Sequence, residues 1–184
     1  DDNSPDGTAD LLDGLAREFG DITVHRRPGK LGIGSAHKFG IAEARRTGYD
    51  QLITLDCDLT HQPSDVARMF LHADADVVVG TRFARSDSLA HWNWMRSAIT
   101  RTGHVATRIL LKMPFDATGA LRRYRFDRLG TAWLDQVESN GYAFFFESLL
   151  VLHRGGADIA GIPIDLPKRT YGSSKMSVLE LARS

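Results

Sequence analysis

The sequence predicts an α/β fold with a mostly parallel sheet and helices on both faces. Short apolar segments that suit buried strands alternate with segments whose apolar residues recur at helical spacing. Strands are expected at residues 22–25, 52–56 and 76–80, with helices at 35–47 and 63–72 between them. This β-α-β-α-β order predicts parallel strands that are joined by right-handed crossovers.

The remaining elements follow from local signals. Residues 1–8 are rich in turn formers and precede a helix over 9–19, whose leucines share one face. Gly48 ends one helix and Pro63 begins the next. Further helices are expected at 96–112, 126–140 and 145–155, an edge strand at 116–124 and a last strand at 159–164.

Length and composition fit one soluble domain over residues 1–184. The chain has 42% hydrophobic residues, and its 23 basic residues equal its 23 acidic residues. This balance provides no basic field for nucleic acid, so no nucleic-acid partner is expected. Cys57, the single cysteine, excludes an internal disulfide framework and fits a reducing compartment, and we expect its side chain to enter the core.

Neither a membrane span nor a signal peptide is visible in the sequence. The apolar runs are all shorter than the about 18 residues that a spanning helix needs. The chain begins without Met inside an acidic motif, and its last helix has no stop signal. We therefore expect both ends to be cut.

The predicted strand at 52–56 ends in two aspartates one residue apart. Asp56 and Asp58 would lie at the carboxyl end of that strand, where open α/β sheets bind ligands. Their carboxylates, with the hydroxyl of Thr60, are hard oxygen donors that suit Mg²⁺ or Mn²⁺. A solvated turn is the alternative for this pattern alone.

Several motifs in order resemble glycosyltransferase family 2 enzymes of GT-A fold. They are residues 1–8, the Gly-rich loop 29–36, the acidic motif 56–63 and Val-Val-Gly-Thr-Arg at 78–82. Asp-Ala-Thr-Gly at 116–119 leading to Tyr124-Arg125, Gly-Tyr-Ala-Phe at 141–144 and residues 169–176 resemble the dolichyl- or polyprenyl-phosphate mannosyltransferase branch. The resemblance covers nearly the whole chain.

The chain departs from the family pattern in two ways. The family begins with a further strand and helix that help to hold the nucleotide base, and this N-terminal βα unit is missing here. Ala120-Leu121 also stands where the family has Ser-Phe or Gly-Phe. The first departure leaves the nucleotide pocket of this chain incomplete, and the second concerns the acceptor side.

On the donor side, the resemblance implies transfer of mannose from GDP-mannose. A divalent ion on Asp56, Asp58 and Thr60 would neutralise the leaving diphosphate as a Lewis acid. Further donor contacts are implied for Asp2, Lys30, Arg169 and Lys175. Asp2 and Lys30 each have a plain alternative as part of a turn.

On the acceptor side, the resemblance implies a lipid phosphate, which is anionic and needs no general base. Arg82, Arg96, Thr100 and Ser174 resemble the residues that contact this phosphate, and the two arginines are also predicted to be catalytic with Asp56 and Asp58. The expected displacement inverts the anomeric carbon and gives a β-linked sugar. For each arginine, a surface charge is the alternative.

A lipid acceptor implies a membrane surface as a partner. In the predicted helix at 96–112, four basic residues share one face and apolar residues lie largely on another. That pattern suits either a helix in the headgroup layer or a helix packed on the core. We expect a peripheral location on the cytoplasmic face of a membrane.

Some residues and functions keep two interpretations. Asp116 would bind a sugar hydroxyl or hold an arginine, and Glu147 matches a family acid or braces its helix. Alternatives to mannose transfer are the same reaction with UDP-glucose, a nucleotidyltransferase, and a non-catalytic membrane-binding module. The donor choice rests on the resemblance.

Overall fold

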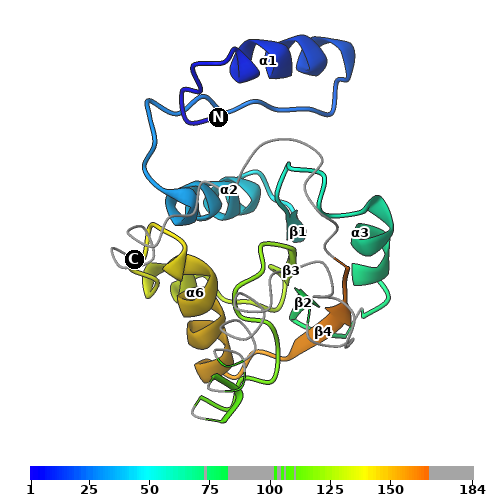
Figure 1. The fold of residues 1–184 in the computed structure, drawn as a ribbon, viewed down its shortest axis with the longest axis vertical. Coiled ribbons are helices and arrows are strands. Elements are labelled where there is room, and N and C mark those ends of the chain that lie inside the picture. Colours follow the sequence, from blue (N-terminus) through cyan, green and yellow to red (C-terminus); the bar gives the residue numbers. More distant parts are fainter. Residues whose placement is uncertain (73, 83–101, 103–104, 106, 110, 166–184) are drawn as a thin grey trace.

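The computed structural model describes residues 1–72, 74–82, 102, 105, 107–109 and 111–165 (Figure 1). Its centre is a four-stranded sheet in the order β1-β3-β2-β4. The strands are β1 (Gln51–Thr54), β2 (Val77–Thr81), β3 (Arg122–Arg125) and β4 (Ile159–Pro163).

Three of these strands point the same way, as predicted, but one runs against them inside the sheet. β3 pairs antiparallel with both β1 and β2, whereas β2 pairs parallel with β4. The predicted edge strand at 116–124 is therefore wrong in its position. Tyr124 lies opposite both Leu52 and Val77 and is fully buried, so β3 is hydrogen-bonded along both sides.

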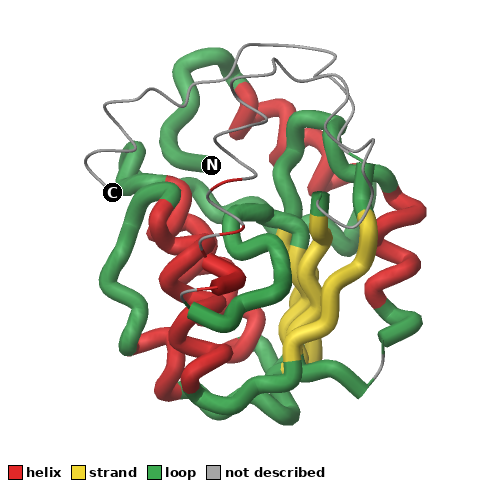
Figure 2. The backbone as a smooth tube through the Cα atoms, turned by 60° about the horizontal axis from the view of Figure 1, so that its bottom comes forward, coloured by secondary structure: helices red, strands yellow, loops and turns green. Residues whose placement is uncertain are grey.

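Helices cover both faces of the sheet, as the sequence predicts (Figure 2). α2 (Ile33–Arg46) and α6 (Ala143–Arg154) pack on one face and α3 (Pro63–Met69) on the other. The side chains of β2 alternate between them: Val77 and Val79 join the larger core, and Val78 joins the smaller one. The sheet is thus the middle layer of three.

The predicted strand at 22–25 does not form. α1 (Thr8–Glu18) and the segment after it form a separate layer at one end of the molecule (Figure 1). Asp1 N donates to His25 O at 2.8 Å, and Arg27 N donates to Asp1 O at 2.7 Å. This is one rung of a parallel ladder, and a strand needs several.

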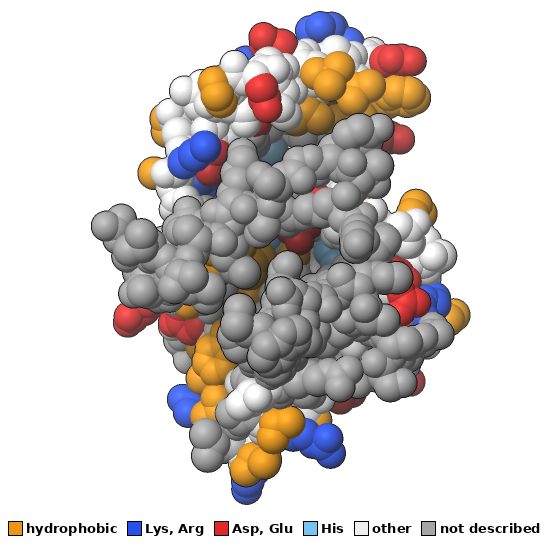
Figure 3. Space-filling model, viewed as in Figure 1, with side chains coloured by type: hydrophobic (Ala, Val, Ile, Leu, Met, Phe, Trp, Pro, Cys, Tyr) orange, Lys and Arg blue, Asp and Glu red, His pale blue; other side chains and the backbone are white. Residues whose placement is uncertain are grey.

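The α1 layer is also poorly buried. Ala9 is the one buried residue of α1, and Leu11, Phe19 and Ile22 are exposed. Figure 3 shows apolar side chains gathered at this end of the molecule. Hydrophobic burial therefore stabilises this layer less than it stabilises the sheet and its helices.

The long helix predicted at 126–140 is reduced to the single turn of α5 (Ala132–Asp135). Arg45 of α2 donates from Nη2 to the carbonyls of Leu129 and Gly130 at 2.9 and 2.8 Å. Those carbonyls serve a tertiary contact rather than a helix. The other predicted helices at 9–19, 35–47, 63–72 and 145–155 and the strands at 52–56, 76–80 and 159–164 match observed elements within a few residues.

The predicted helix at 96–112 lies only partly within the described residues. Residues 102, 105 and 107–109 are helical there. Across the part of the chain that the structure describes, no helix has the length and apolar character needed to cross a membrane.

Candidate active site

The polar edge of the sheet brings together residues that lie far apart in the sequence. β1 and β2 end at this edge, and β3 begins there because it runs antiparallel to both. β4 ends there too, since Pro163 is paired with Thr81. Residues after β1, after β2 and before β3 therefore lie at this edge. They are Asp56, Asp58, Thr60, Arg82, Asp116 and Thr118.

Asp58 lies in a tight turn after β1. Its Oδ1 accepts hydrogen bonds from Thr60 N at 3.2 Å and from Thr60 Oγ1 at 2.6 Å. Between them, Leu59 has a φ of 63°, a left-handed conformation that costs energy for a branched side chain. The turn fixes the Asp58 carboxylate beside the Thr60 hydroxyl.

Asp56 lies at the start of the same loop, with its side chain 38% exposed. The imidazole of His61 is buried behind it, with Nε2 3.8 Å from Asp56 Oδ2. Cys57 is exposed, so the prediction that it enters the core is wrong. β1 ends at Thr54, and the alternation of side chains in an extended strand no longer applies at residue 57.

Residues 56–60, called here the acidic turn, offer hard oxygen donors rather than a complete set of metal ligands. In the described residues, no group of three or more His, Cys, Asp and Glu side chains forms a metal-binding cluster. Two carboxylates and a hydroxyl are a small set, and Mg²⁺ is commonly held by one or two carboxylates together with substrate phosphates. The donor set therefore fits a divalent ion that a phosphate ligand helps to hold.

Arg82 is held by a buried carboxylate. Its Nε and Nη2 donate to Asp116 Oδ2 and Oδ1 at 2.6 and 2.9 Å, and Nη2 also contacts Thr118 Oγ1. Thr118 in turn donates to Asp116 Oδ1 from its backbone N at 3.1 Å and its hydroxyl at 3.0 Å. Arg82, Asp116 and Thr118 form one network, called here the arginine cluster.

The arginine cluster keeps Asp116 ionised. Burial tends to raise the pKa of Asp116, which is 1% exposed, but the hydrogen bonds and charge of Arg82 outweigh it and hold that pKa below its usual value. A carboxylate held in this way is a poor proton acceptor. The geometry favours the interpretation in which Asp116 holds an arginine.

His37 of α2 lies close enough to Asp56 and Arg122 for their charges to act on it, and it was not predicted as a site residue from the sequence. Burial, and then the positive charge of Arg122, lower its pKa to about 4, against an opposing effect of Asp56. Its ring packs on Phe144 and Phe145 with centroid distances of 5.5 and 4.9 Å. The available signal was its position four residues before Ile41, on the buried face of α2.

The N-terminal layer places Asp2 beside α2. Arg27 Nε lies 2.9 Å from Asp2 Oδ1, and Arg27 Nη2 donates to Ser35 Oγ at 3.1 Å. Lys30 is exposed in the loop before α2.

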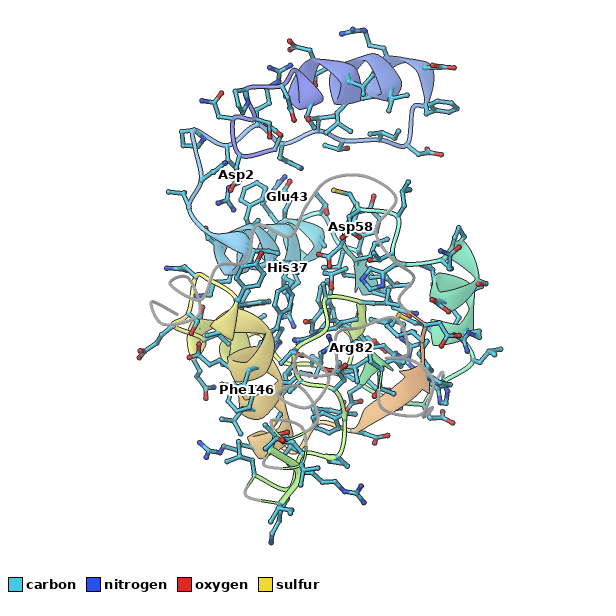
Figure 4. The ribbon with its side chains drawn as sticks, viewed as in Figure 1. Asp2, His37, Glu43, Asp58, Arg82 and Phe146 are labelled. Atoms are coloured by element: carbon cyan, nitrogen blue, oxygen red, sulfur yellow. The ribbon has the colours of Figure 1, made fainter. Side chains whose placement is uncertain are left out.

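The labelled site residues come from different parts of the fold, as Figure 4 shows for Asp2, His37, Asp58 and Arg82. The predicted site residues Arg96, Thr100, Arg169, Ser174 and Lys175 lie outside the described residues.

Two glycines of the Gly-rich loop have a packing role. A Cβ on Gly34 would lie 2.5 Å from Phe144 Cβ, and a Cβ on Gly32 would overlap Asn140 O. Ser35 N donates to Asn140 O at 3.1 Å, so the start of α2 lies directly on the segment before α6. This close approach requires glycine whether or not a phosphate binds nearby.

Glu147 braces the segment before α6. Its carboxylate accepts hydrogen bonds from the backbone N atoms of Glu138 at 2.9 Å and Ser139 at 2.8 Å. Of the two interpretations of Glu147, the structure supports the brace.

Two neighbouring arginines of β3 were also not predicted. Arg122 and Arg123 are 0% and 1% exposed and point to opposite faces of the sheet. Charged residues are rarely buried without a charged partner, so no sequence pattern pointed to them.

Comparison with known proteins defines the class. Residues 1–150 match the sequence model of Glycosyl transferase family 2. The chain belongs to this family and is a glycosyltransferase with the α/β fold described above, as the resemblance implied.

Two curated relatives narrow the comparison. The chain is 36% identical over 179 residues to an undecaprenyl-phosphate mannosyltransferase of Micrococcus luteus, covering 96% of this chain and 74% of that protein. It is 34% identical over 181 residues to a polyprenol monophosphomannose synthase of Mycolicibacterium smegmatis, covering 96% of this chain and 68% of that protein.

One solved structure is also similar in part. It is a protein from Desulfovibrio desulfuricans G20 assigned as a nucleotide-diphospho-sugar transferase, with a TM-score of 0.47 and 16% identity. The match covers 85% of this chain and 55% of that protein.

Proposed function

We propose that this glycosyltransferase transfers mannose from GDP-mannose to a polyprenyl phosphate and forms a polyprenyl-phosphate β-mannose. The observation that carries the proposal is the presence of the acidic turn and the arginine cluster at one sheet edge. An acidic turn suits a metal-bound diphosphate, and an arginine suits a second phosphate. Mannose and a polyprenyl acceptor are supported by the names of the two relatives.

On the donor side, Asp56, Asp58 and Thr60 would hold Mg²⁺ or Mn²⁺. When bound, such an ion neutralises charge on the leaving diphosphate as a Lewis acid. Asp58 is already oriented by Thr60, so the turn holds a carboxylate in place before any ligand arrives. Asp2, Lys30, Arg169 and Lys175 are proposed as further donor contacts.

On the acceptor side, a lipid phosphate attacks without losing a proton. Its oxygen forms a bond to the anomeric carbon while the bond from that carbon to the diphosphate breaks, which inverts the configuration and releases GDP. No general base is required, which agrees with an Asp116 that is committed to Arg82. Arg82, Arg96, Thr100 and Ser174 are proposed to position the phosphate.

A lipid substrate places the enzyme at a membrane surface, and we propose peripheral binding on the cytoplasmic face. Val105 and Ile109, which belong to the helical residues 105 and 107–109, are 50% and 70% exposed. Arg108 and Lys112 beside them are also exposed. Exposed apolar side chains with neighbouring cations suit the headgroup layer of an anionic membrane.

The test is a transfer assay with the full protein, polyprenyl phosphate and Mn²⁺ or Mg²⁺. Labelled GDP-mannose and labelled UDP-glucose are supplied in parallel, and label in the organic phase is counted. Label from GDP-mannose alone, dependent on the metal and lost on Asp58→Ala, is expected. Transfer from UDP-glucose alone would overturn the donor, and release of pyrophosphate would indicate a nucleotidyltransferase. No transfer from a folded, membrane-bound protein would contradict the proposal.

A further inference from the structure

The guanidinium of Arg122 is fully buried and bound by neutral oxygens. Nε donates to Gly119 O at 2.9 Å, and Nη2 donates to Ala117 O at 3.0 Å and Phe145 O at 2.5 Å. Nη1 donates to Ser148 Oγ at 2.9 Å and lies 3.5 Å from the hydroxyl of Tyr124. Among the described residues, no carboxylate forms an ion pair with it.

These contacts join two parts of the molecule. Phe145 and Ser148 belong to α6, whereas Ala117 and Gly119 belong to the segment that leads into β3. The Arg122 guanidinium therefore links residues 117–119 to α6, because it donates hydrogen bonds to carbonyls of that segment and to Phe145 and Ser148 of α6. The side chains of that same segment, Asp116 and Thr118, hold Arg82.

Arginine is the residue that this position requires. Burying a cation costs free energy unless hydrogen bonds compensate it. The guanidinium has five N–H groups in a planar fork, and here they reach acceptors on both elements. A lysine carries a single nitrogen, so it cannot reach both sets of carbonyls at once.

We propose that Arg122 is a positioning residue for the acceptor phosphate. It fixes residues 117–119 on α6, so that Asp116 and Thr118 hold Arg82 in one orientation at the sheet edge. The inference rests on the proposed function, in which Arg82 contacts that phosphate. Arg122 itself is buried and touches no substrate.

Arg123 provides a matched control. It is equally buried, and it donates to the carbonyls of Met69 at 2.9 Å, His72 at 2.7 Å and Ala75 at 3.1 Å. Those carbonyls lie at the end of α3 and just after it, on the opposite face of the sheet. Loss of Arg123 therefore removes a similar set of hydrogen bonds without touching residues 116–119.

The first test compares Arg122→Met and Arg123→Met in the full protein, with Arg122→Lys and Arg123→Lys as milder variants if the Met variants do not fold. We expect Arg122→Met to raise the KM for polyprenyl phosphate by about tenfold or more, because Asp116 would no longer hold Arg82 in the orientation that contacts the phosphate. The KM for GDP-mannose should stay unchanged. Arg123→Met should lower thermal stability and leave both KM values unchanged. Equal effects of the two variants on the acceptor KM would overturn the inference.

A double variant tests the route of action. If Arg122 acts through Arg82, adding Arg122→Met to Arg82→Met should change the acceptor KM by less than about twofold. Two effects that multiply would show that Arg122 acts elsewhere.

A second measurement needs no activity. The Arg82 Nε–H proton, assigned by its loss in Arg82→Lys, is followed by NMR. Its exchange with solvent should be about tenfold faster in Arg122→Lys and unchanged in Arg123→Lys. Only the first change loosens the hydrogen bonds by which Asp116 and Thr118 hold Arg82 in the arginine cluster. Faster exchange in an enzyme that transfers no mannose would contradict the proposed function alone. Unchanged exchange in an active enzyme would contradict the role of Arg122 alone.

Discussion

Asp56 and Asp116 lie at the same edge of the sheet in opposite surroundings. Asp56 is 38% exposed in a loop, and the imidazole of His61 lies 3.8 Å from its carboxylate. Asp116 is 1% exposed and bound by the Arg82 guanidinium through two hydrogen bonds. The same type of side chain thus lies in two different settings, and burial and a fixed cation decide what a carboxylate can bind.

The contrast extends to the threonines near these aspartates. Asp58 is oriented by Thr60, and Asp116 by Thr118, each through a hydroxyl two residues later in the chain. In the first pair Asp58 is half-buried and Thr60 is buried, whereas the second pair binds Arg82. The difference supports the proposal that a diphosphate–metal complex binds at the acidic turn and a second phosphate at the arginine cluster.

The largest effect should come from Asp58→Asn. Removing one proposed metal ligand should lower the rate of mannose transfer by about a thousandfold, since a Lewis acid contributes several kcal/mol. The free energy of unfolding should change by less than about 1 kcal/mol, because Asp58 lies in a half-buried loop. Steady-state rates and urea unfolding test both, with the exposed Asp21→Asn as control. A rate within about threefold of the parent, about 0.7 kcal/mol, would refute the role.

Asp116→Asn should lower stability and, because Asp116 orients Arg82, also raise the KM for polyprenyl phosphate. Breaking a buried ion pair leaves Arg82 without its partner and should cost about 3 kcal/mol. Urea unfolding measures the loss, and the Mn²⁺ requirement for transfer should remain. A loss below about 1 kcal/mol would place this pair with ordinary surface ion pairs.

The same pair should also make stability depend on acid pH. The folded-state pKa of Asp116 is below its ordinary value of 3.8. The stabilisation is therefore fully present above pH 3.8 and is lost as the pH falls through the lower folded-state pKa. Acid titration of the unfolding free energy should show this fall in the parent and not in Asp116→Asn.

His37 should give a smaller effect in a different pH range. Its folded-state pKa is about 4, against an ordinary value of 6.5, so the unfolded chain binds a proton first as the pH falls. Stability should decrease between pH 6.5 and pH 4, by roughly 2 to 3 kcal/mol. His37→Gln should remove this dependence in urea unfolding. A variant that keeps the full slope would show that another group titrates.

Cys57→Ser should have the smallest effect. The thiol is exposed between the two aspartates and is not needed as a ligand for a hard cation. Transfer rates should stay within about twofold and stability within about 0.5 kcal/mol. A large loss of activity would indicate that the thiol participates in the metal site.

The local pattern of the sequence was sufficient for most helices and three strands. Residues 35–47 carry an apolar face at helical spacing, and the structure has α2 there. The segments that failed depend on distant partners. Residues 22–25 have a strand-like composition, but within the described part of the chain they find only Asp1 as a pairing partner. In residues 126–131, the carbonyls of Leu129 and Gly130 accept hydrogen bonds from Arg45.

The site was predictable where it followed a strand end. Asp56, Asp58 and Arg82 each follow a recognisable apolar strand, and the structure brings all three to one edge. The pairing of Arg82 with Asp116 spans 34 positions and depends on β3 entering between β1 and β2. No local pattern indicates that insertion, and for the same reason the burial of Arg122 was not foreseen.

The most direct test of the account is Mn²⁺ binding in the presence of GDP, measured by electron paramagnetic resonance. The parent protein and Asp116→Asn should bind the ion with similar affinity, and Asp58→Asn should bind it at least about tenfold more weakly. Unchanged binding by Asp58→Asn, or a loss confined to Asp116→Asn, would contradict the assignment of the metal to the acidic turn.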